Sequence, residues 1–97
     1  METCSRTLLR FRLRAGRLLN AADAAHEAGD VARAARLYLA AARELHAGCR
    51  AAAAGLDWAH PSYSDVGALG ADIAMAERLM DIGGECLLAA LPAEGNA

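Results

Sequence analysis

The chain has 97 residues and a formal net charge of −2, and 56% of its residues are hydrophobic but only 4% are aromatic. A chain of this length makes one domain and buries roughly two thirds of its unfolded surface, which is enough for a modest core. Alanine inflates the hydrophobic fraction, and β-branched residues are scarce. The composition therefore argues against a sheet and predicts a thin, helical core.

Charge is distributed unevenly along the chain. Residues 1–50 hold nine of the ten basic residues, all of them arginine, whereas residues 51–97 hold Arg78 and seven acids. A chain without lysine has no Schiff-base or phosphate-loop lysine, and no Ser-His-Asp or Cys-His set falls on turns. We therefore expect no enzymatic activity and no cofactor. Aromatic residues for base stacking are missing and the second half is acidic, so no nucleic-acid partner is expected either.

Three cysteines, Cys4, Cys49 and Cys86, are too widely spaced for a disulfide framework or a zinc site. His46 and Cys49 share a helical face, but two ligands do not complete a metal site, so no metal is expected. Free cysteines fit a reducing, cytoplasmic compartment. No apolar run approaches the roughly 20 residues that span a bilayer, so any membrane contact is expected to be peripheral.

The first predicted helix covers residues 6–28. Between Thr3 and Ala22 the chain has five arginines and no acid, a composition shared by mitochondrial presequences and basic membrane-surface helices. Apolar residues at spacings of three and four favour instead the first helix of a bundle. These residues are Leu8, Phe11, Ala15, Leu18, Ala22 and Ala25.

A Gly-Asp turn separates this helix from a second one, predicted over residues 31–54. Gly29 can adopt the left-handed conformation that ends a helix, and Asp30 can cap the next one. Alanines on both sides let the helices approach closely, with Tyr38 as the bulky buried side chain. The predicted buried stripe contains Val31, Ala35, Tyr38, Ala42, Leu45, Cys49 and Ala52.

The third predicted helix covers residues 62–88, after a connection whose Trp58 should lie over the end of the core. Ser62 and Asp65 approximate a capping box. Glycines at 67 and 70 predict close backbone approach, and Gly83-Gly84 predicts a kink or the end of the helix. The predicted apolar side contains Val66, Leu69, Ile73, Ala76, Met80 and Leu87.

Together these elements predict an all-α, antiparallel three-helix bundle in which residues 1–91 form one interaction domain and residues 92–97 a disordered tail. Residues 25–41, AHEAGDVARAARLYLAA, resemble the helical hairpin of the tetratricopeptide repeat and of the related microtubule interacting and trafficking (MIT) domain. Residues 76–79, AERL, look like the end of the third MIT helix, and the chain is too short for about three 34-residue repeats. The chain is therefore similar to an MIT domain over residues 8–88, although Met75 stands where that family usually has arginine.

This resemblance implies a role as an adaptor in protein transport. MIT domains typically bind short motifs at the C-termini of ESCRT-III filament subunits, in grooves between their helices. The implied site is a groove between the second and third helices, which takes a partner helix carrying leucines and an arginine. Ile73 aligns with the apolar groove residue of the family and Glu77 with the acid that pairs with the arginine. The expected partner-binding residues are Leu69, Ile73, Ala76, Glu77, Met80 and Asp81.

Three other interpretations of the same features stay open. The acidic residues of the third helix are equally consistent with an ordinary solvated face. The charge asymmetry is consistent with a homodimer in which the basic first helix of one copy lies on the acidic third helix of another. The basic first helix is also consistent with a mitochondrial or membrane-surface protein that uses it as a targeting segment.

Overall fold

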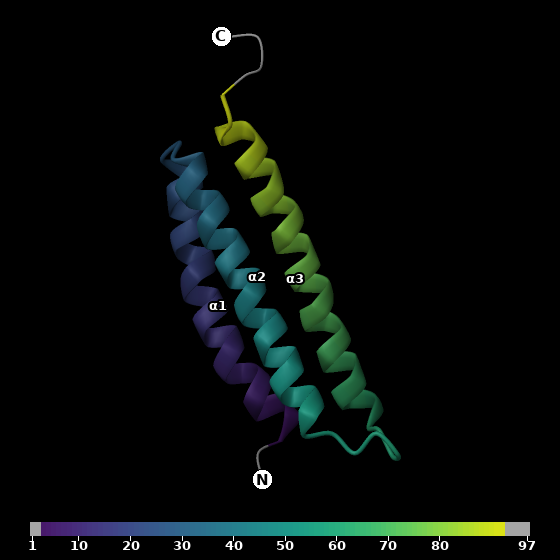
Figure 1. Cartoon of the computed structure of the whole chain (residues 1–97). Helices are drawn as coiled ribbons and strands as arrows, with labels where there is room; N and C mark the ends of the chain where they lie inside the picture. The colour runs from purple at the N-terminus through teal and green to yellow at the C-terminus, as the bar shows by residue number, and fades with distance from the viewer. Residues whose placement is uncertain (1–2, 93–97) are drawn as a thin grey trace.

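The computed structural model describes residues 3–92, which form three helices: α1 (Cys4–Glu27), α2 (Val31–Ala54) and α3 (Tyr63–Ala90). Figure 1 shows the consecutive helices running in opposite directions, with α2 between α1 and α3. Most packing joins α1 to α2 and α2 to α3, so the bundle is open between α1 and α3. The predicted all-α three-helix bundle is confirmed, with helix ends within two residues of those predicted. From residue 93 on, the predicted tail lies outside the described residues.

The turn between α1 and α2 follows the sequence prediction. Gly29 has a φ of +81°, in the left-handed region that favours glycine. The N–H of Asp30 donates to the carbonyl of Ala25, and the N–H of Gly29 donates to the carbonyl of His26. These two bonds make a Schellman motif, which satisfies the last carbonyls of α1. The Asp30 side chain then accepts from the N–H of Arg33 at 3.2 Å and caps α2.

The loop before α3 lies more open than expected. Trp58 does not cover the core: the residue is 60% exposed, and its indole N–H donates to the carbonyl of Ala53 at 3.1 Å. The Ser62 hydroxyl accepts from the N–H of Asp65 at 3.4 Å and caps α3. This bond is one half of the predicted capping box.

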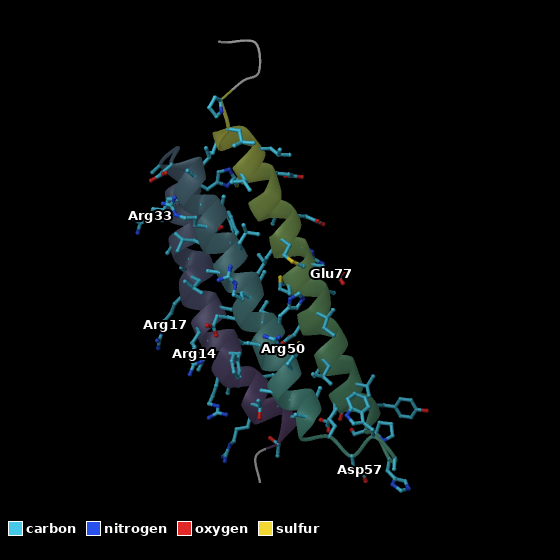
Figure 2. All side chains as sticks on the ribbon, viewed as in Figure 1. Arg14, Arg17, Arg33, Arg50, Asp57 and Glu77 are labelled. Atoms are coloured by element: carbon cyan, nitrogen blue, oxygen red, sulfur yellow. The ribbon has the colours of Figure 1, made fainter. Side chains whose placement is uncertain are left out.

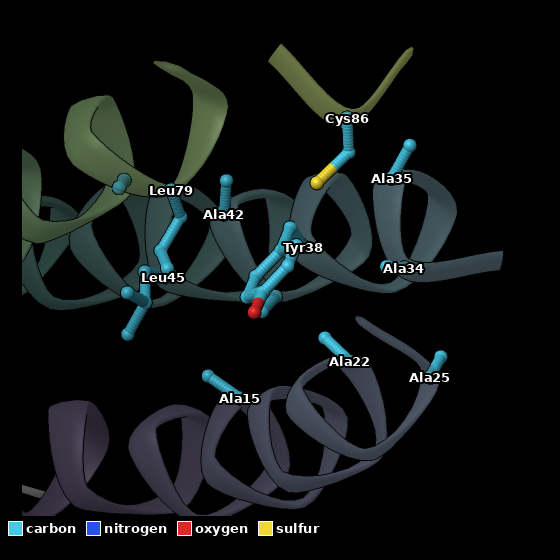
Figure 3. Close-up of a cluster of buried hydrophobic side chains, with 12 residues drawn as sticks. Ala15, Ala22, Ala25, Ala34, Ala35, Tyr38, Ala42, Leu45, Leu79 and Cys86 are labelled. Atoms are coloured by element: carbon cyan, nitrogen blue, oxygen red, sulfur yellow. The ribbon is translucent and has the colours of Figure 1, made fainter. Parts of the chain in front are cut away.

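Tyr38 occupies the centre of the larger core cluster, as predicted, and is only 4% exposed. Figure 3 shows its ring surrounded by alanines of α1 and α2, with Leu79 and Cys86 approaching from α3. Its hydroxyl donates to a carboxylate oxygen of Asp23 at 2.6 Å. Because the neighbouring side chains are so small, this ring fills the space that would otherwise separate the helices.

A smaller core cluster lies near the N-terminal ends of α1 and α3. It contains Cys4, Leu8, Cys49, Ala52 and Leu69. Burial raises the pKa of the Cys4 and Cys49 thiols, so both stay protonated at neutral pH. These cysteines therefore act as small apolar core residues.

An ion pair joins α1 to α3. The Nε of Arg12 donates to both carboxylate oxygens of Asp72, at 3.0 and 2.8 Å, and Asp72 is only 7% exposed. This hydrogen bond raises the pKa of the Arg12 guanidinium further above its usual value. The pair places one of the predicted basic residues of the first helix against an acid of the same chain.

Glycines permit close packing at two positions other than those predicted. A Cβ added at Gly48 would lie 2.7 Å from the Cβ of Phe11, and one added at Gly83 would lie 2.9 Å from the Leu39 side chain. At Gly67 and Gly70 nothing lies within 4 Å of an added Cβ, so the prediction of close approach there is wrong.

The third helix does not end at Gly83-Gly84, as the sequence allowed, because α3 continues to Ala90. Gly83 is buried in the packing against α2, where Leu39 and the carbonyl of Ala35 lie next to it. Tertiary packing on this face offsets the weak helix propensity of the two glycines, which costs about 1 kcal/mol each.

Candidate functional site

The third helix has a buried face and, beside it, an exposed apolar row. Val66, Ile73, Met80 and Leu87 are 44%, 41%, 39% and 48% exposed. They recur every seven residues, so they lie on one side of α3, and we call this row the α3 seam. The face that packs on α2 contains Leu69, Asp72, Ala76, Leu79, Gly83 and Cys86.

Two of the predicted partner-binding residues therefore lie in the core. Leu69 is 6% exposed and Ala76 is fully buried, so neither side chain is available to a partner and their assignment to the site is corrected. The sequence pattern had placed buried and exposed residues on a single apolar side. α3 is turned so that the packed face lies about one residue position away from that side.

A groove runs between α2 and α3 beside the seam. One hollow of about 470 Å³ is lined by Arg43, His46, Cys49, Arg50, Ala53 and Ile73. A second hollow of about 240 Å³ is lined by Leu39, Ala42, Arg43, His46 and Met80. Because Arg43 and His46 line both hollows, the two form one continuous surface, which we call the α2–α3 groove. The predicted residues Ile73 and Met80 thus lie where a groove was expected.

Opposite charges flank this groove. Arg43 and Arg50 lie on α2, whereas Glu77 and Asp81 are exposed on α3. Figure 2 shows Arg50 and Glu77 on the two neighbouring helices. Within residues 3–92 these four side chains make no hydrogen bond or ion pair with one another or with any other group. They are therefore free to pair with charges on a bound molecule.

The basic side of the groove was missed in the sequence analysis. Arg36, Arg43 and Arg50 recur every seven residues, the same interval as the α3 seam. That interval was the signal that could have revealed one row of arginines beside one apolar row.

The base of the groove holds a buried thiol. Cys49 lies at its base, 6% exposed, with its Sγ 3.8 Å from the carbonyl oxygen of Leu69 and its thiol held protonated by burial. Among residues 3–92, no three His, Cys, Asp or Glu side chains are placed to hold a metal ion. The groove presents apolar side chains between two charged edges, an arrangement suited to a peptide helix.

The α1 surface offers less free charge than its composition indicated. Arg12 pairs with Asp72, and the Arg14 guanidinium lies 3.9 Å from Glu44 and over the ring of Phe11. The apolar stripe of α1 packs on α2 through Leu8, Ala15, Ala22 and Ala25. This packing confirms the prediction that the segment is the first helix of the bundle.

No protein-family model, curated protein or solved structure matches this chain. The resemblance to the MIT domain therefore rests on the residues quoted for it. None of the three helices within residues 3–92 is both long and apolar enough to cross a lipid bilayer.

Proposed function

We propose that this chain is a non-catalytic protein–protein interaction module that binds an amphipathic helix of a partner in the α2–α3 groove. The observation that carries the proposal is the α3 seam, whose four large apolar residues stay 39–48% exposed beside a hollow between two helices. A partner helix with apolar residues at intervals of three, four and seven would cover this seam.

The charges beside the groove define the chemistry of that partner. Leucines of the partner would pack on Ile73 and Met80, and an arginine on one flank would meet Glu77. Arg43 and Arg50 favour an acidic residue on the other flank. Apolar burial would supply most of the affinity, and each exposed charge pair about 1 kcal/mol or less.

The resemblance to MIT domains supports a more specific form of the proposal. A partner of the ESCRT-III type, with a C-terminal tail that carries leucines and arginine, would make the chain an adaptor in protein transport. Ile73 and Glu77, which align with the apolar and acidic binding residues of that family, are both exposed and lie one helical turn apart on α3.

A synthetic helical peptide tests the proposal. It carries leucines every three or four residues, arginine on one flank and glutamate on the other, and its binding to the full chain is followed by fluorescence anisotropy. Ile73→Asp should abolish binding while the helical circular dichroism stays unchanged. Leu88→Asp makes the same change at a 71% exposed residue outside the seam and should bind as the unaltered chain does.

Charge exchange then tests the orientation of the peptide. Glu77→Arg should weaken binding, and replacing the peptide arginine by glutamate should restore it. If Ile73→Asp binds the peptide as tightly as the unaltered chain, the groove is not the binding site and the proposal is wrong.

A further inference from the structure

We propose that the α2–α3 groove also binds α3 of a second copy of this chain, so that two copies form a symmetric four-helix bundle. The two-fold axis would run parallel to the helices, and α2 and α3 of each copy would form one half of the four-helix bundle. This inference rests on the proposed function in one respect, because both place a helix in the same groove; here the occupant is the chain itself.

The apolar seam has the repeat of a helix-to-helix interface. Val66 and Leu87, the first and last residues of the seam, are 21 positions apart, which is about 30 Å of helix. An apolar residue at every seventh position supplies one of the two core positions of the heptad repeat by which a helix faces a partner helix. In this chain no element within residues 3–92 covers the row, since each of its members remains 39–48% exposed.

The charges of the two helices lie at matching heights. Leu39 packs on Gly83, and the Sγ of Cys49 lies 3.8 Å from the carbonyl oxygen of Leu69. Because the helices are antiparallel, a step forward along α2 corresponds to a step back along α3. Four residues forward from Leu39 and four back from Gly83 make residue 43 level with residue 79, and six residues back from Cys49 and six forward from Leu69 make it level with residue 75. Arg43 is therefore level with Glu77, the midpoint of these positions.

The same counting relates a second pair. Arg36, three residues before Leu39, is level with residue 86 and so lies beside the level of Glu85. Arg36 and Glu85 are both exposed, and neither forms an ion pair within residues 3–92. Glu85 is eight residues after Glu77, however, which turns it about 80° around α3 and about 120° from Ile73. Arg43 and Glu77 are therefore the pair that matches in both height and face.

Symmetry converts this match into self-complementarity. A two-fold axis parallel to the helices lays α3 of the second copy over α2 of the first, antiparallel and at an unchanged height. Arg43 then faces Glu77 of the second copy, and by symmetry this pair occurs twice. A two-fold axis perpendicular to the helices would instead place α2 of one copy on α2 of the other and bring the arginines of the two copies together. Charge complementarity therefore selects the second copy as occupant and the parallel axis as its geometry.

Charge reversal provides the test, with sedimentation equilibrium of the full chain at low salt as the measurement. Arg43→Glu or Glu77→Arg alone should weaken the dimer about tenfold or more, because two attractive contacts become repulsive. An equimolar mixture of these two variants should recover the affinity as a heterodimer, and the double variant should recover it as a homodimer. Arg17→Glu makes the same change of charge on α1, outside the groove, and should leave the dimer unchanged.

Each possible result decides between the proposals. A chain that stays monomeric up to about 0.1 mM, or a dimer that survives Ile73→Asp, overturns this inference, and so does a mixture no tighter than its separate variants. If the synthetic peptide binds such a monomeric chain in the groove, the proposed function stands and only the second copy is excluded. If charge exchange restores the dimer but the peptide does not bind, the partner-binding proposal fails and the dimer stands. Circular dichroism of each variant verifies that the helices are intact.

Discussion

Truncation of Tyr38 tests the packing on which the whole bundle depends. Tyr38→Ala removes a ring that is 4% exposed and surrounded mainly by alanines, which have no side-chain length to close the cavity. Large-to-small changes of this kind cost about 3 to 5 kcal/mol. Loss of the hydrogen bond between the Tyr38 hydroxyl and Asp23 adds only about 1 kcal/mol to this cost, because Asp23 is exposed and water takes the place of the hydroxyl in the variant. We expect a loss of about 4 kcal/mol in the free energy of unfolding.

Urea denaturation followed by circular dichroism measures this loss, and two further variants divide it into its causes. Tyr38→Phe keeps the ring and removes only the hydroxyl, so it should cost about 1 kcal/mol. Tyr63→Ala truncates a tyrosine that is 97% exposed and should change stability by less than about 0.5 kcal/mol. The measurements are made at one protein concentration, because association would add to the apparent stability.

A small loss for Tyr38→Ala would refute the reasoning. If it costs under about 1 kcal/mol, with the dependence on urea unchanged, the ring does not hold α1 and α3 against α2. A loss for Tyr38→Phe as large as for Tyr38→Ala would assign the stability to the hydroxyl bond rather than to the filled volume.

Three further predictions concern pH, the turn and the packed glycine. The hydrogen bond to Asp23, together with burial, raises the pKa of Tyr38 to about 12 from an ordinary 10.0, so the folded state holds the phenolic proton more tightly. The resulting contribution to the free energy of unfolding is complete below pH 10 and is lost as pH rises toward 12, at about 1.4 kcal/mol per pH unit. Unfolding measured at alkaline pH should show this loss of stability, and Tyr38→Phe should lack this part of it. Gly29→Val forces a branched side chain to a φ of +81° and should cost more than about 1 kcal/mol in thermal or urea unfolding, and an unchanged stability would contradict the left-handed turn. Gly83→Ala should be less stable than Gly70→Ala by about 2 kcal/mol in the same unfolding measurements. Both variants gain helix propensity, but only Gly83→Ala places a Cβ 2.9 Å from the Leu39 side chain. Equal stabilities would mean that Leu39 repacks freely.

The sequence by itself determined the features that depend on local rules. The ends of the helices follow from caps at Asp30 and Ser62 and from the left-handed Gly29, each of which acts within a few residues. Most of the buried stripe of α2 was also predictable, since Ala35, Tyr38, Ala42, Leu45, Cys49 and Ala52 lie on one apolar row. Ala34, Ala41 and Gly48 are buried as well but lie outside that row, because α2 packs on both α1 and α3. For the candidate site, the sequence indicated the two helices and the groove residues Ile73 and Met80, while partner binding stays a prediction.

Only the tertiary structure decided which side of α3 is buried. Apolar residues occur all around this helix, so periodicity does not choose between Ala76 and Leu79 on one side and Ile73 on the other. The choice depends on what α2 presents: its packing surface accepts the face that includes Gly83 and Asp72. Asp72 becomes buried there because Arg12 reaches it from another helix, 60 residues away in sequence. Contacts between residues so far apart leave no pattern in the local sequence, and for that reason only the folded chain shows which apolar row of α3 stays exposed.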